Sequence, residues 1–247
     1  MRQASLPPLG IRYWAGICAA SVFGAAVGDF LSHQLHLGHW RGVPPLAAVF
    51  GLILWSERRA RVGSTGFYWL AVVVVRAAAT NIADLASHDL HFGQVPLLGG
   101  LVVLMILLGS IGAASRTQSA VRPDGTAAYW AALFVAGTLG TVLGDDTSGR
   151  LGVGLASMLL STVLVLLFVV RRAVPNKSSY WLAMLGARSA GTSVGDFLAD
   201  SDGLGLGIPL ATAGSGLAML ALLLGGRASG ASPAHPGGDE AAPPSAG

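Results

Sequence analysis

Charged residues are scarce in this sequence of 247 residues: only 11% are Asp, Glu, Lys or Arg, while 53% are hydrophobic. A soluble domain usually carries about 25% charged residues, which cover its surface in water. This composition excludes an ordinary soluble domain and predicts an integral membrane protein. The formal net charge of +3 is small, so we expect the lipid bilayer as the main partner and no nucleic acid.

The sequence has a single cysteine, Cys18, which excludes a disulfide within the chain. Cys18 lies in an apolar run and is interpreted as a packing residue. The sequence also lacks a phosphate-binding loop, a dinucleotide fingerprint and a nucleophile elbow. No activated nucleophile with a complete acid–base set is apparent. We therefore expect neither an enzyme nor a bound cofactor.

What the sequence does contain is a motif that occurs four times. Each copy has a Tyr-Trp pair, an aspartate sixteen residues after the tyrosine, and a glycine nine residues after the aspartate. Two spacings that recur four times indicate an internal repeat. The tyrosines are Tyr13, Tyr68, Tyr129 and Tyr180; the aspartates are Asp29, Asp84, Asp145 and Asp196; the glycines are Gly38, Gly93, Gly154 and Gly205.

A second apolar run follows each glycine, so each repeat predicts a helical hairpin. The fold class is an all-α integral membrane protein with eight transmembrane helices in four tandem hairpins. The second runs cover roughly 43–56, 95–114, 151–170 and 208–225, and the first of them is short for a bilayer core of ~30 Å. We expect an N-terminal segment (1–12), a membrane domain (13–227; repeats at about 13–57, 68–115, 129–171 and 180–226) and a disordered tail (228–247).

Basic residues predict the orientation. Eleven of them lie before the first repeat, between repeats or after the last helix, whereas the opposite turns hold only Arg41 and Arg150. The positive-inside rule then places both termini, and every Tyr-Trp pair, on the cytoplasmic side of the membrane. The Tyr-Trp pairs are interpreted as an aromatic belt at the membrane interface.

The first helix of each repeat is rich in Gly, Ala and Ser, and the second is rich in Leu and Val. Small residues permit close approach of helices in lipid, so the first helices should form an inner ring. Arg76 and Arg188 each lie eight residues after their tyrosine, near the midplane. Repeats one and three lack this arginine, so repeats one and two are duplicated as three and four. The candidate binding residues on the inner helices are Asp29, Asp84, Asp145, Asp196, Arg76, Arg188, Thr80 and Thr192.

Charges inside a membrane are rare and are usually paired or functional. Four aspartates and two arginines leave an excess of negative charge that would suit a cation near the outer face. The alternative is that the arginines and aspartates pair across helices and only fix the packing.

Histidines follow the first two aspartates with one spacing, Asp-x3-His-x2-His. If the helix continues past the aspartate, His33 and His36 share a face with Asp29, and His88 and His91 share one with Asp84. Imidazole and carboxylate together are ligands for zinc and similar divalent metals. The alternative is a polar turn exposed to water that happens to contain histidine.

The segments YWAALFVAGTLGTVLGDD and YWLAMLGARSAGTSVGDFLADSDGLGLG resemble a bacterial family described as "uncharacterised membrane-anchored protein". Its members typically have four aromatic-Trp…Gly-Asp repeats, the last with an arginine. The resemblance implies the polytopic topology and carries no activity.

We therefore expect a transporter or channel-like protein of the bacterial inner membrane for a small cation, with a divalent metal as its substrate. The four aspartates would bind the cation, and the four histidines would collect it at the outer mouth. A non-transporting structural or sensory membrane protein is the alternative. A third hypothesis is that Arg76 and Arg188 bind an anionic ligand.

Overall fold

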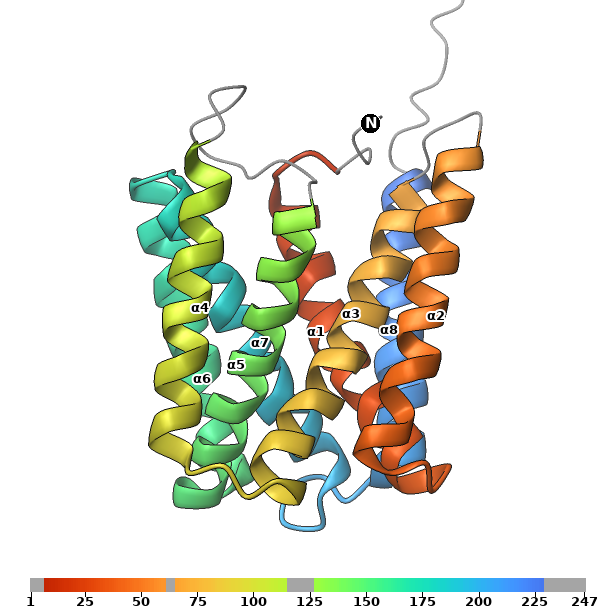
Figure 1. Cartoon of the computed structure of the whole chain (residues 1–247), viewed down its shortest axis with the longest axis vertical. Helices are drawn as coiled ribbons and strands as arrows, with labels where there is room; N and C mark the ends of the chain where they lie inside the picture. The colour runs from red at the N-terminus through yellow and green to blue at the C-terminus, as the bar shows by residue number, and fades with distance from the viewer. Residues whose placement is uncertain (1–6, 61–64, 115–126, 229–247) are drawn as a thin grey trace, which may run out of the picture.

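The computed structural model describes residues 7–60, 65–114 and 127–228. Within these ranges the chain is all-α, with eight α-helices that run alternately in opposite directions (Figure 1). The predicted tail lies, from residue 229 on, outside the described residues. The helices are α1 (Ile11–Asp29), α2 (Gly38–Arg59), α3 (Thr65–Asp84), α4 (Gln94–Ala114), α5 (Ala127–Leu151), α6 (Val153–Ala173), α7 (Lys177–Ala199) and α8 (Gly207–Ala228).

The four odd-numbered helices form an inner ring. α1 contacts α3, α3 contacts α5, α5 contacts α7, and α7 contacts α1. Their side chains are largely buried, whereas α4, α6 and α8 expose many Leu and Val side chains on the outside. The prediction that the helices rich in small residues lie inside is therefore confirmed.

The even-numbered helices do not pack mainly within their own repeats, as the hairpin prediction implied. α2 packs against α3, α4 against α5, α6 chiefly against α7, and α8 chiefly against α1. Each outer helix thus covers the inner helix of the next repeat, and the last repeat covers the first. Because α8 packs on α1, this arrangement brings the first and last repeats of the chain together in one bundle.

Glycine permits the close approach of neighbouring inner helices. The residue eleven positions after each tyrosine contacts the residue eight positions after the next tyrosine around the ring. A Cβ on Gly24 would lie 2.7 Å from Cβ of Arg76, and a Cβ on Gly140 would lie 2.5 Å from Cβ of Arg188. The same contact joins Gly191 to Ser21, and Ala79 to Gly137. The ring is therefore built from one contact used four times.

Among the described residues, five segments are long and apolar enough to cross a membrane: Ile11–Gln34, Thr65–Asp89, Ala127–Leu151, Val153–Ala173 and Gly207–Gly225. These spans and the apolar exterior indicate a multi-pass membrane protein. The short second run of repeat one, predicted at 43–56, is wrong in length, because α2 extends from Gly38 to Arg59 and contains Pro44 and Pro45.

Candidate functional site

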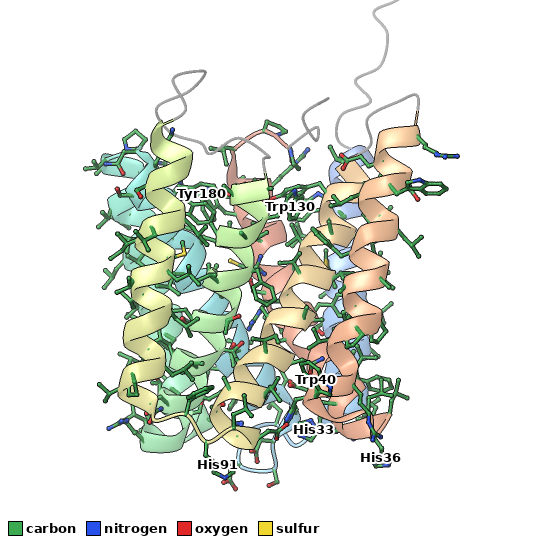
Figure 2. All side chains as sticks on the ribbon, viewed as in Figure 1. His33, His36, Trp40, His91, Trp130 and Tyr180 are labelled. Atoms are coloured by element: carbon green, nitrogen blue, oxygen red, sulfur yellow. The ribbon has the colours of Figure 1, made fainter. Side chains whose placement is uncertain are left out.

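Polar side chains occupy the axis of the inner ring in layers. Tyr180 and Trp130 lie toward one end of the bundle, and His33, His36 and His91 lie at the other (Figure 2). We call these the tyrosine end and the carboxylate end. The two arginines lie between them, because each follows its tyrosine by eight residues and precedes its aspartate by eight.

The four tyrosine hydroxyl groups form a closed ring of hydrogen bonds. Tyr13 is bonded to Tyr68 (3.0 Å) and to Tyr180, and Tyr129 is bonded to Tyr68 (2.8 Å) and Tyr180 (3.3 Å). All four side chains are buried, with at most 3% of their surface exposed. The hydroxyl ring closes the bundle axis at the tyrosine end.

The tryptophans form a second layer around the hydroxyl ring. Each indole lies 5.2–5.4 Å from the tyrosine ring of its own repeat and 5.5–6.0 Å from that of the preceding repeat. Trp69, Trp130 and Trp181 are buried. The interpretation of these pairs as an interfacial belt is therefore wrong. They are packed inside the bundle, where the tyrosine hydroxyl groups form hydrogen bonds with one another rather than with water.

Arg76 lies fully buried in the middle of the axis, and every N–H of its guanidinium has an acceptor. Nε donates to the carbonyl of Ser21 (3.3 Å). Nη1 donates to the carbonyl of Gly137 (3.1 Å) and to the hydroxyl of Thr141 (2.6 Å). Nη2 donates to the carbonyl of Arg188 (3.3 Å) and to the hydroxyl of Thr192. One side chain therefore joins all three other inner helices.

Arg188 occupies the same position in repeat four and is equally buried, with 0% of its surface exposed. Within the described ranges its guanidinium donates one hydrogen bond, from Nη1 to the hydroxyl of Ser21 (3.3 Å). Nε and Nη2 have no partner among the described residues. The four tyrosines, Cys18 and Arg76 are in electrostatic range of Arg188.

The two threonines predicted from the sequence, Thr80 and Thr192, also differ in their hydrogen bonds, as the two arginines do. Thr192 accepts a hydrogen bond from Arg76, whereas the buried hydroxyl of Thr80 has no partner among the described residues. Thr141, which the sequence reasoning missed, lies at the equivalent position of repeat three. A search for side chains twelve residues after each tyrosine would have found it, since three of the four repeats have threonine there.

The four aspartates gather at the carboxylate end. Every pair among them lies within electrostatic range, and Arg76 is in range of all four. Within the described ranges, no arginine or lysine forms an ion pair with any of the four. The alternative in which Arg–Asp pairs hold the bundle together is wrong as a description of direct contacts. The carboxylates lie within electrostatic range of one another and of Arg76 instead.

The helices change geometry immediately after the first two aspartates. A π-helical turn, η1 (Phe30–Gln34), follows Asp29, and another, η2 (Leu85–Asp89), follows Asp84. The chain then turns at His36 (φ 52°) and His91 (φ 53°), in the left-handed region where histidine is enriched among residues other than glycine. The helix does not continue to these two residues, so the predicted shared face is wrong for His36 and His91, which point into solvent.

His39, which the sequence reasoning left out of the site, lies at the centre of the histidine cluster. Its Nδ1 lies 3.1 Å from both carboxylate oxygens of Asp89, and its Nε2 lies 4.0 Å from Oδ2 of Asp84. Its ring centroid is 5.5 Å from that of His33 and 6.5 Å from that of His88. In the described part of the chain, no group of three or more His, Cys, Asp or Glu side chains is close enough to hold a metal ion.

A cleft with a volume of about 540 Å³ opens at the carboxylate end between repeats two and three. His88, Asp145 and Asp146 line it together with Arg150, whose Nε donates to Asp146 (2.6 Å). The cleft leads from the outside of the bundle to one of the four clustered carboxylates.

Two segments of the chain match a family model, a Repeat of Unknown Function (DUF347). The matches cover residues 12–62 and 179–229. They correspond to repeats one and four, the two repeats that α8 joins by packing on α1. No curated protein and no solved structure matches the chain. The internal repeat is thus supported by an independent comparison, and it carries no assigned activity.

Proposed function

We propose that this protein transports a small cation, a divalent metal ion, across the bacterial inner membrane, and that it is not an enzyme. The observation that supports this most strongly is the carboxylate cluster. Four aspartates are held within electrostatic range of one another, and no basic side chain of the described residues is paired with them. Like charges gathered in a membrane protein are costly unless a cation or bound protons neutralise them, and a site that can take up protons can exchange them for a metal ion.

The histidine cluster supports a divalent metal as the substrate. Asp84 is 93% buried, and among the residues that the structure describes only His39 lies within ion-pair distance of it. His33 and His88 flank that imidazole. A histidine that holds a carboxylate through one nitrogen is oriented to bind a metal through the other. We expect the ion to draw these side chains together, since they are not close enough for coordination as they stand.

Arg76 is the proposed gate. Thr141 and Thr192, its hydroxyl acceptors, each lie four residues before a clustered aspartate, Asp145 and Asp196. A divalent ion bound by the cluster would repel the guanidinium and weaken its attraction to the carboxylates. Cation binding would thereby favour release of Arg76 from its five acceptors, the step that opens the axis toward the hydroxyl ring.

The test is uptake into liposomes that contain the purified protein and a metal-sensitive dye, with manganese, zinc, nickel and cobalt supplied in turn. Asp84→Asn and Asp196→Asn should reduce the rate at least tenfold, a loss of 1.4 kcal/mol or more. Asp202→Asn, an exposed aspartate outside the cluster, is the matched control and should transport normally. Cellular metal content of a strain that lacks the gene should change in the same direction. No uptake of any of the four ions would refute the proposal.

A non-transporting structural or sensory protein is the second candidate. The closed hydroxyl ring and the fully hydrogen-bonded Arg76 favour it, because both stabilise one packed state. In that case the aspartate variants would change the unfolding temperature in detergent, and none of the liposomes would take up metal.

A further inference from the structure

Arg188 differs from every other polar group on the axis in what surrounds its charge. It is fully buried, and three of its five N–H groups, on Nε and Nη2, have no acceptor among the described residues. A guanidinium inside a membrane protein is costly unless it is paired or hydrogen-bonded. Arg76, at the same depth, shows that this core can satisfy all five N–H groups of an arginine.

The unpartnered nitrogens also have a specific geometry. Nε and Nη2 lie on one edge of the guanidinium, where their N–H groups project in parallel. This edge is the fork that binds two oxygens of a carboxylate or a similar oxyanion. A single-atom anion such as chloride cannot use the fork as well as an anion with two oxygens.

We propose that Arg188 binds a small monovalent oxyanion, such as a carboxylate, through this fork. Arg188 donates to Ser21, eight residues after Tyr13, whereas Arg76 donates to Thr141 and Thr192, which lie four residues farther toward the aspartates of their helices. The four tyrosines are in electrostatic range of Arg188, and the clustered aspartates lie toward the other end. The anion site is thus separate from the carboxylate cluster, and Arg76 lies between them.

The anion reaches Arg188 from the tyrosine end. At the carboxylate end, the four aspartates repel an anion and Arg76 fills the axis. At the tyrosine end, only hydrogen bonds between neutral hydroxyl groups close the ring. Such bonds between helices are individually weak in membrane proteins, so the ring can open.

The experiment measures the unfolding temperature of the full chain in detergent as sodium formate replaces sodium gluconate at constant ionic strength. Formate offers two oxygens and is small, so it should raise the unfolding temperature with a saturating dependence on concentration, as expected for a ligand of the folded state. Chloride at the same concentration should give a smaller rise.

Two variants separate charge from geometry. Arg188→Met should abolish the response to formate, and Arg188→Lys, which keeps a charge without the fork, should weaken the apparent affinity about tenfold. Gly149→Ala, at a position with no atom within 4 Å of the added Cβ, is the control and should respond like the unmodified chain. If Arg188→Met does not fold, Arg188→Lys decides the question.

Three outcomes would overturn the proposal. These are an unmodified chain without a response to formate, an equal response in Arg188→Lys, and an equal rise with chloride and with formate. None of them bears on metal uptake, which the liposome assay measures independently.

Discussion

Arg76 and Arg188 occupy equivalent positions in repeats two and four, yet they lie in different environments. Arg76 donates five hydrogen bonds and is in electrostatic range of the four clustered aspartates. Arg188 donates one hydrogen bond within the described residues, to Ser21, and is in electrostatic range of the four tyrosines. The two arginines lie at one depth and cannot both bind the same acceptors. Arg76 even donates to the backbone carbonyl of Arg188. The comparison shows that a duplicated sequence gives two sites with different chemistry.

The largest expected effect comes from removing each arginine in turn. Arg76→Met should lower the free energy of unfolding by roughly 3 kcal/mol, because five hydrogen bonds between helices are lost at ~0.6 kcal/mol each. Arg188→Met should cost less than about 1 kcal/mol, or even stabilise the protein without added anions, because it removes a buried charge with one bond. Unfolding in mixed micelles by a denaturing detergent measures both. Equal losses would mean that the two arginines are equivalent after all.

The contact between Gly140 and Arg188 tests how rigidly the second arginine is held. A Cβ at residue 140 would lie 2.5 Å from Cβ of Arg188 and 2.9 Å from its backbone carbon, so the two helices must separate. Gly140→Ala should therefore destabilise the protein by about 1–3 kcal/mol. It should also displace the Arg188 carbonyl that Arg76 uses. Gly149→Ala is again the control, and a Gly140→Ala protein as stable as this control would contradict the close packing.

The threonines four residues beyond the arginines provide a smaller and sharper comparison. Thr192→Val removes a hydroxyl that accepts from Arg76 and should cost about 1–2 kcal/mol. Thr80→Val removes a buried hydroxyl without a partner among the described residues and should be neutral or slightly stabilising. The same unfolding measurement distinguishes them. A larger loss of stability for Thr80→Val than for Thr192→Val would contradict the absence of a hydrogen-bond partner for the Thr80 hydroxyl in the described part of the bundle.

Much of the fold could be predicted from the spacing of residues. The positions of Tyr68, Arg76 and Asp84 along one helix set their order along the axis, and small residues such as Gly24 and Gly140 identified the inner ring. These are properties of a single helix, which a fixed rise per residue determines. The packing partners of the outer helices cannot be predicted in this way, because their Leu and Val runs do not indicate which inner helix each one covers.

The contacts across the axis could not be predicted in the same way. The equal spacing of the four tyrosines predicts that they lie at the same depth near the membrane surface. It does not show that the inner ring brings their side chains into contact. The hydroxyl groups that accept hydrogen bonds from Arg76 depend on the directions of side chains on three different helices. The π-helical turn after Asp29 also has no clear pattern in the sequence, and it moved His36 off the predicted face and brought His39 beside Asp89.

A small expected effect on stability comes from the hydroxyl ring that separates Arg188 from the tyrosine end. Tyr68→Phe removes a hydroxyl group that is bonded to Tyr13 and Tyr129, and should cost only about 1.2 kcal/mol, because two such bonds average ~0.6 kcal/mol each in a membrane protein. Its effect on kinetics should be larger, because an incomplete ring opens more readily. Formate binding, followed by tryptophan fluorescence after rapid mixing, should become faster while the apparent affinity stays within about threefold, since the fork of Arg188 is unchanged. Thr80→Val lies beyond the arginines and should leave the rate unaltered. A Tyr68→Phe protein that binds formate at the unmodified rate would show that the anion does not pass the hydroxyl ring.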